Sequence, residues 1–147
     1  MPKTGDRLDP FVNFNFRVEI GGVQVAAFHE CSGLDSSVDV IEHREGGGPI
    51  LKLPGNTKFS NIVLKRGLTS NQDFYDLHRD CIEGRIKRTS GSVILMDRAG
   101  VEVARWNFKD AWPAKWVGPS LTAEGNDVAI ETLELAHEDL ERVKVGA

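Results

Sequence analysis

Residues 13–20 alternate apolar and polar side chains without interruption. Such a period of two is the pattern of a half-buried strand, with one face toward a core and the other toward water. The pair Gly21 and Gly22 comes next and permits the positive φ angles of a two-residue turn, so a return strand is expected over residues 23–28. The apolar members of the first strand are Phe14, Phe16, Val18 and Ile20.

The rest of the chain continues this β pattern. Glycine- and proline-containing turns are expected at 46–49 and 53–56, and a hairpin turn at 97–100. We expect a single domain, 1–147, which begins with a mobile arm over 1–10 and ends with a short charged tail over 138–147. Further strands are predicted over 34–45, 58–66, 86–89, 92–97, 101–109 and 127–137.

One helix is expected between the strands. Ser70 is a good N-cap residue, and Gly84 suits the position just past the C-terminal end. Phe74, Leu77 and Ile82 fall on one helical stripe, which predicts that they anchor the helix on the β core. The fold class is therefore mainly β, with one helix laid against a sheet or barrel.

Net charge and the distribution of charged residues exclude two classes of protein, those that bind nucleic acid through bulk positive charge and those that span a membrane with an apolar helix. A chain of 147 residues with a formal net charge of −4 does not bind nucleic acid through bulk positive charge. Its longest run without a charged residue, 20–29, is too short to span a membrane. The first residues lack the apolar segment of a signal peptide, which predicts assembly in the cytoplasm.

No catalytic, metal or cofactor site is predicted. The glycine run 46–48 lacks the Gly-Lys-Ser/Thr sequence of a phosphate-binding loop, and the histidines lack the spacing of a zinc site. Cys31 and Cys81 are interpreted as reduced, buried, small apolar residues. Trp106, Trp112 and Trp116 form either a core and interface cluster or a ligand-binding surface.

Several short segments, in order and over nearly the whole chain, resemble the tail tube proteins of contractile phage tails and of phage-tail-like contractile injection systems. The segments are 14–20 (FNFRVEI), 32–35 (SGLD), 45–47 (EGG), 52–55 (KLPG), 64–67 (LKRG), 79–84 (RDCIEG), 104–108 (ARWNF), 111–116 (AWPAKW) and 130–138 (IETLELAHE).

The resemblance implies two packed antiparallel sheets in a barrel-like domain with one flanking helix. It also implies sixfold rings of identical subunits, stacked into an inner tube whose central channel passes cargo protein or DNA. Expected partners are further copies of the chain, a surrounding sheath protein, and baseplate and tube-terminating proteins. The product would be a phage virion tail or an injection particle, and segments 42–47 and 130–138 favour the injection particle.

Two segments are predicted to make contacts between subunits. Strand 34–45 has polar residues on both faces, so a second chain or a watery channel would complete it. The segment 46–57 is expected to be a mobile loop that orders against the next ring; the alternative is that its apolar residues fold back on their own domain. The strand residues are Val38, Val40, Glu42 and Arg44; the loop residues are Gly46, Gly47, Gly48, Pro49, Ile50, Leu51, Lys52, Leu53 and Pro54.

Other interpretations remain open at this point. Opposite charge on the basic strand 58–66 and the acidic segment 127–141 would suit side-by-side packing of copies. Within the family that the chain resembles, the alternative role is that of a baseplate protein that has the same fold and initiates the tube. A monomeric β-sandwich that binds a ligand through the tryptophans is the alternative from another class.

Overall fold

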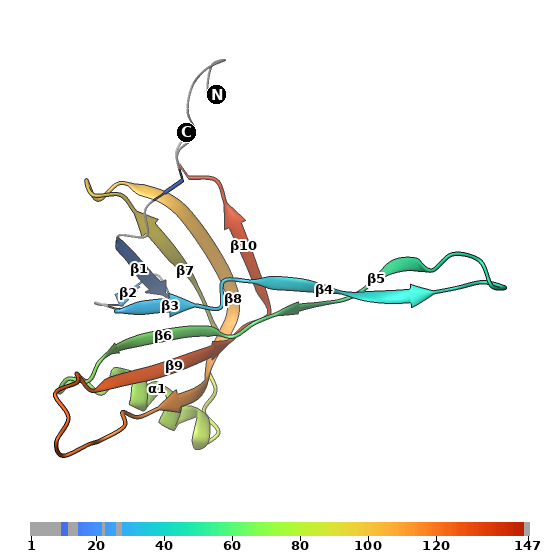
Figure 1. Ribbon diagram of the computed structural model, residues 1–147. Coiled ribbons are helices and arrows are strands. Elements are labelled where there is room, and N and C mark those ends of the chain that lie inside the picture. The colour runs from blue at the N-terminus through green and yellow to red at the C-terminus, as the bar shows by residue number, and fades with distance from the viewer. Residues whose placement is uncertain (1–9, 12–14, 22, 26–27, 146–147) are drawn as a thin grey trace.

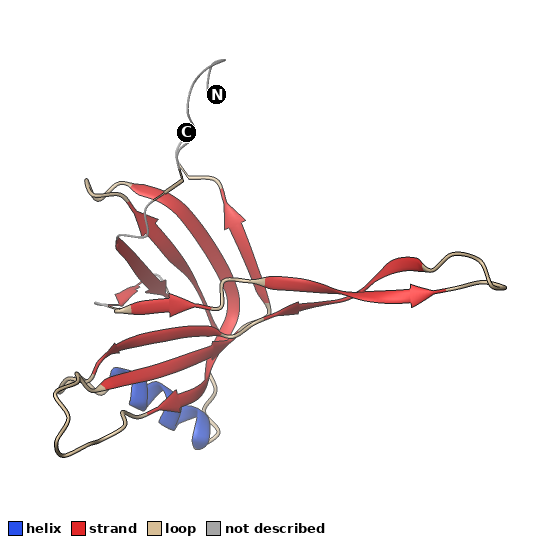
Figure 2. Ribbon diagram, viewed as in Figure 1, coloured by secondary structure: helices blue, strands red, loops and turns tan. Residues whose placement is uncertain are grey.

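The computed structural model describes residues 10–11, 15–21, 23–25 and 28–145 (Figure 1). Over these ranges the chain forms ten strands and one helix (Figure 2). Residues 1–9 of the arm predicted over 1–10 lie outside the described residues, as do Phe14 and Gly22. The elements are β1 (Asn15–Ile20), β2 (Val23–Val25), β3 (Glu30–Ser32), β4 (Ser36–His43), β5 (Leu51–Phe59), β6 (Ile62–Gly67), α1 (Asp73–Ile82), β7 (Thr89–Met96), β8 (Glu102–Val117), β9 (Ile130–Ala136) and β10 (Asp139–Val143).

Eight of the strands belong to one antiparallel sheet. Neighbours run in the order β2-β1-β7-β8-β9-β6-β3, and β10 also pairs with β8. The remaining two strands, β4 and β5, pair with each other as a separate two-stranded sheet. Within the described residues the end strands β2 and β3 do not pair with each other, so the barrel stays open.

Strand β8 divides the sheet into two layers. Its first part pairs with β7 and β10, and its last part, from Trp112 to Val117, pairs with β9. Asp110, between the two parts, has a positive φ of 53°, and the ladder to β7 shifts register beside it, as at a β-bulge. One layer holds β1, β7, the start of β8 and β10, and the other holds the end of β8, β9 and β6 (Figure 1). The predicted two-layer, mainly β fold is confirmed.

The core lies between the layers and follows the alternation of the strands. In β6 every second residue is buried, and in β9 the same holds, so that Leu64 and Leu133 pair directly opposite each other. In β8 the residues Ala104, Trp106 and Phe108 face the core, and Phe108 is fully buried. The buried apolar cluster is Val18, Ile62, Leu64, Phe74, Val93, Phe108, Ala111, Leu133 and Leu135.

Helix α1 begins later than predicted. Ser70 is not its N-cap: the Asn71 Oδ1 accepts a hydrogen bond from the Asp73 backbone N–H at 2.9 Å, a local turn that holds the chain outside the helix until Asp73. The end is as predicted, because Gly84 has a φ of 84° and its N–H donates to the Cys81 carbonyl at 3.1 Å.

The predicted helix anchors are only partly correct. Phe74 is 1% exposed and stacks on Phe28 with ring centroids 5.3 Å apart. Leu77 and Ile82 are 44% and 57% exposed, so they do not hold the helix on the core. The helix lies at one end of the sandwich (Figure 1), and Phe74 is its one fully buried residue. Its later turns still contact β8, where the His78 Nδ1 lies 3.1 Å from the Pro113 carbonyl oxygen.

Three predictions, of one turn and two strands, are wrong in their bounds. The turn predicted at 53–56 is part of β5, because a two-stranded ribbon has open edges that accept Pro54 without the loss of a central ladder bond. Ser60 and Asn61 separate β5 from β6, which the sequence joined into one strand over 58–66. The segment 86–88 is not a strand, and β7 begins at Thr89.

Two further strands differ from the prediction: β8 is longer than expected, and β10 was not expected. β8 continues for eight residues past Lys109, through Pro113 and the last two tryptophans. The segment interpreted as a charged tail contains β10, which pairs with β8 so that Leu140 lies opposite Phe108. Its apolar contribution is a single inward leucine between charged neighbours, which is why the alternation is hard to see in the sequence.

Candidate functional site

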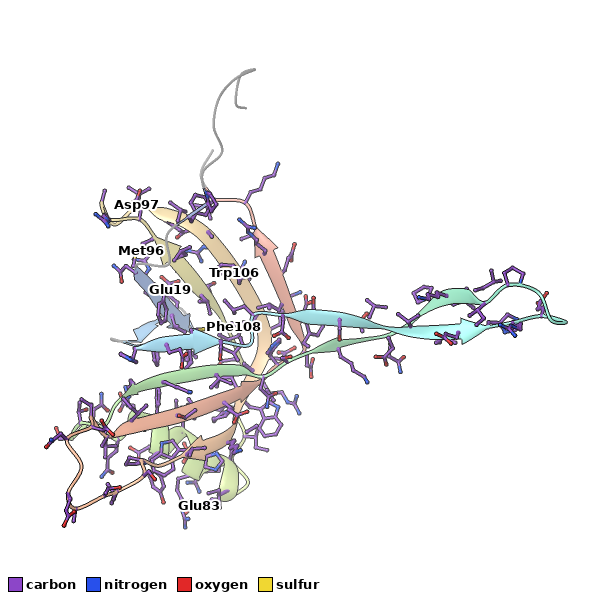
Figure 3. The ribbon with its side chains drawn as sticks, in the orientation of Figure 1. Glu19, Glu83, Met96, Asp97, Trp106 and Phe108 are labelled. Carbon is purple, nitrogen blue, oxygen red and sulfur yellow. The ribbon has the colours of Figure 1, made fainter. Side chains whose placement is uncertain are left out.

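The hairpin formed by β4 and β5 projects from the body of the protein (Figure 1). Its side chains stand out on both sides of the ribbon, with no other element beside most of its length (Figure 3). In the part of the chain that the structure describes, the two strands pair only with each other. An isolated two-stranded hairpin is marginally stable in water at best, so this arrangement favours a partner that covers it.

The hairpin register is well defined over its length. Ile41 pairs with Leu53, Glu42 with Lys52, and Val40 with Pro54. An irregularity between Val38 and Val40 places an extra residue on β5, where Gly55 approaches the Asp39 carbonyl closely enough that a Cβ would lie 3.1 Å from it. Near the base, the Lys58 Nζ lies 3.2 Å from the Asp39 Oδ2.

Apolar side chains of the hairpin face solvent on both strands. Val40 is the most exposed at 63%, and the others are about half exposed. Such a patch on a folded chain marks a site of interaction. The exposed apolar residues are Val38, Val40, Ile41, Ile50, Leu51 and Leu53.

The tip of the hairpin, residues 44–54, covers most of the segment 46–57 predicted to be a loop. Only 44–50 lacks strand structure, and 51–57 belongs to β5, so the loop prediction is wrong for that part. Gly46 and Gly47 have φ angles of 54° and 81°, and the Gly48 N–H donates to the Glu45 carbonyl at 2.9 Å. These glycines close the turn beyond Arg44, which lies at the tip and not in β4. Ile50 and Leu51 extend away with the hairpin, so the alternative that they fold back on their own domain is wrong.

The tryptophans do not form one ligand-binding surface. Trp106 packs against the core and lies 5.9 Å from the Arg142 guanidinium carbon, while Trp116 meets Tyr75 of α1 edge-on with centroids 5.2 Å apart. These surroundings belong to opposite parts of β8. The structure therefore does not favour the ligand-binding alternative.

The opposite charges of 58–66 and 127–141 meet within one chain. Arg66 of β6 pairs directly with Glu131 of β9, whereas Lys65 lies 3.3 Å from Glu30 of β3, which is outside the acidic segment. Arg66 is therefore neutralised by Glu131 within one protomer, and the packing of copies through the other charges of these segments stays a prediction.

The cysteines lie in environments that disfavour the thiolate. Burial, and secondly the charge of Glu30, raises the pKa of Cys31 to about 12. Burial, and secondly Asp80, raises the pKa of Cys81 as well. Both cysteines are free and partly buried, against the expectation of full burial. Because the thiolate is the nucleophile, neither residue is activated for covalent chemistry.

The described ranges show neither a metal site nor a membrane-spanning helix. No group of three or more His, Cys, Asp or Glu side chains in those ranges is placed to hold a metal ion. The one helix in those ranges, α1, is neither long enough nor apolar enough to cross a membrane.

Comparison with known proteins identifies relatives of this fold. The chain is 28% identical to a protein of the sheath–tube complex of PVC, an extracellular contractile injection system in its extended state; the match covers 92% of this chain and 93% of that one, with a TM-score of 0.84. A protein in the structure of the anti-feeding prophage cap, the AFP tube terminating cap, is 27% identical over 99% of this chain and 100% of that one, with a TM-score of 0.86.

A more distant similarity concerns the fold alone. Hcp1 from Flavobacterium johnsoniae is 14% identical, with a TM-score of 0.56 over 90% of this chain and 97% of that one. No curated protein sequence matches the chain. The model of the T4-like virus tail tube protein gp19 family matches residues 12–141. Because this match spans both layers, the hairpin and α1, the chain belongs to that family and is a tail tube protein.

Proposed function

We propose that this protein assembles into hexameric rings that stack into the inner tube of a contractile injection system. Family membership and the similarity to a tube complex at 28% identity support this assignment. On this proposal the protein is structural and has no catalytic role. Its partners are other copies of itself, a surrounding sheath, and the baseplate and cap proteins at the two ends of the tube. Cargo protein or DNA passes through the channel.

The observation that carries the proposal is the projecting hairpin. Its apolar residues lie half exposed on a ribbon that has no third strand in the described chain. A ring or stack of identical subunits removes this exposure, because each copy can cover the hairpin of another. The strand residues Val38, Val40 and Glu42 then contact a neighbouring subunit, and the tip from Gly46 to Pro54 reaches the adjacent ring.

Electron microscopy of the purified protein tests the assembly. Negatively stained wild-type protein should show rings of about six subunits and stacks of rings. Light scattering that finds only a 16.2 kDa species at high concentration would contradict the proposal. Single rings without stacks would instead favour the role of a baseplate protein that initiates the tube.

A loop replacement separates stacking from ring formation. Replacing Gly47 to Leu51 with a Gly-Ser linker of equal length should leave folded protein and single rings but abolish long tubes. The matched control replaces residues 122–126, an exposed turn on the other side of the body, with the same linker. Normal tubes from the hairpin variant, or equal loss of tubes from the control, would contradict a stacking role for the tip.

A further inference from the structure

A shallow groove lies on α1, next to the end of β1. It has a volume of about 360 Å³. Phe74 forms its buried floor, and Leu77, which the core leaves 44% exposed, forms an apolar wall. The residues that line the groove are Ile20, Asp73, Phe74, Asp76, Leu77 and Asp80.

The rim of this α1 groove is negatively charged. Asp73, Asp76 and Asp80 are spaced by three and four residues and so share one helix face with Leu77. Asp80 is neutralised by Arg85, whose Nη2 lies 3.0 Å from the Asp80 Oδ1. Asp73 and Asp76 have no ion-pair partner within the described ranges. An occupant of the groove therefore needs apolar side chains together with positive charge.

The tip of the β4–β5 hairpin has this composition. Leu51 and Leu53 are half exposed, and Arg44 and Lys52 lie among these apolar residues. Neither cation has an ion-pair partner in the described part of the chain. The tip also carries Glu45, which lies 3.4 Å from His43. Glu42 lies opposite Lys52 in the hairpin register but forms no ion pair with it, so the two cations are available to the two unpaired aspartates of the groove.

The hairpin cannot fill the groove of its own protomer. It extends away from the body, whereas α1 lies beneath the ends of β8 and β9 (Figure 1). A strand rises about 3.3 Å per residue, so β5 alone is about 30 Å long. A chain of this size has a radius of gyration of about 15 Å, so the hairpin can cross the whole face of a second copy.

We propose that the tip of the β4–β5 hairpin of one copy docks in the α1 groove of another copy. Leu51 or Leu53 packs on Leu77, while Arg44 and Lys52 approach Asp73 and Asp76. The contact is heterologous, so every copy offers one tip and one groove, and the contact can repeat around a ring or along a stack. The inference rests on the proposed tube function and adds to it the surface that receives the hairpin.

Cysteine cross-linking tests the contact directly. The variant Leu51→Cys/Leu77→Cys, in a Cys81→Ser background, is treated with a mild oxidant. Because a disulfide needs Cα atoms within about 7 Å, only docking lets the two positions react. The expected result is a ladder of covalent oligomers on a non-reducing gel. In the control, Leu51→Cys/Val128→Cys, the second position is 74% exposed and outside the groove, and no ladder is expected.

Charge reversal provides a second, independent test. Asp73→Lys/Asp76→Lys and Arg44→Glu/Lys52→Glu should each reduce tube formation, and the four changes combined should restore it. The control Glu124→Lys/Asp127→Lys changes the same amount of charge outside the groove and should form normal tubes. Thermal unfolding of each variant identifies those that fail to fold, and restoration by the combined variant shows that both partners are intact.

The outcomes separate this inference from the proposed function. Wild-type tubes without a cross-linked ladder, or with a ladder equal to that of the control, overturn the docking contact and leave the tube function standing. Reversal of the aspartates without loss of tubes also overturns it, and leaves the groove for a different protein. A wild-type protein that stays monomeric overturns both.

Discussion

Arg66 and Glu131 form an ion pair inside the protein, with the Arg66 Nε 3.1 Å from the Glu131 Oε1 and both side chains less than a tenth exposed. The Arg66 guanidinium carbon also lies 3.7 Å from the centre of the Phe74 ring. The pair thus joins β6 and β9 and contacts the residue that fixes α1. It lies at the junction of sheet and helix, where an unpaired charge would be buried.

Removal of one member of this pair should be costly. Breaking a buried ion pair by truncating one partner destabilises a protein by about 3–5 kcal/mol. We expect Glu131→Ala to lower the free energy of unfolding by that amount in urea titrations. The control is Glu134→Ala, because Glu134 lies on the outer face of the same strand, 3.7 Å from Lys115. An exposed pair of this kind contributes about 0–1 kcal/mol, so equal effects would contradict the prediction.

Gly91 should not tolerate a side chain. A Cβ at this position would lie 2.1 Å from the Glu19 carbonyl oxygen and 2.6 Å from the Phe108 Cζ. Gly91→Ala therefore forces β1, β7 and β8 apart, and overpacking of this kind costs about 1–3 kcal/mol. The melting temperature should fall clearly. Gly67→Ala is the matched strand control, because its nearest contact would be Val128 Cγ1 at an ordinary 3.7 Å, and it should have little effect.

In the isolated protomer, the packing of α1 on the core should depend mainly on the side chain of Phe74. Phe74→Ala removes a fully buried ring and should lower the free energy of unfolding by about 3–5 kcal/mol. Leu77→Ala should cost about 1 kcal/mol, because much of this side chain already faces water. Chemical denaturation at a concentration too low for assembly measures both. A Leu77→Ala effect as large as that of Phe74→Ala would show that Leu77 is part of the core after all.

Cys31 should make the protein sensitive to alkaline pH. Its pKa is 9.0 before burial and about 12 in the folded chain, so the unfolded state loses this proton first as the pH rises. The contribution of the thiol to stability is complete below pH 9.0, and it declines as the pH rises toward 12. Urea unfolding at several pH values should show a steeper alkaline decline for wild type than for Cys31→Ala; parallel curves would contradict this.

The sequence predicted the elements whose alternation is regular and whose burial is one-sided. Strands β1 and β9 are examples, since their apolar side chains recur at every second residue and face one core. The same reasoning failed for β5, where Pro54 and Gly55 indicate a turn. A strand with an open edge accepts proline and glycine that a central strand would not. No local sequence pattern shows whether a segment will become an edge strand or a central strand.

The helix anchors and the groove show a second limit. Periodicity placed Phe74, Leu77 and Ile82 on one stripe, but it cannot show how far the sheet extends beneath that stripe. The helix contacts the sheet beyond Phe74, at Tyr75 and His78, but Leu77 and Ile82 of the stripe remain about half exposed. The receiving groove also needs Ile20, which lies more than fifty positions away in the sequence. Such a juxtaposition follows only from the three-dimensional path of the chain.

Because β8 belongs to both layers, the two layers are joined by a single continuous backbone. In a sandwich held together only by side chains, the layers can slide when they are pulled in different directions. Here the strand resists such sliding along its own covalent bonds, and the hydrogen bonds to β7, β9 and β10 distribute the tension. Mechanical stiffness of the protomer is therefore a property of one strand, and forced unfolding should begin elsewhere, at the short end strands β2 and β3.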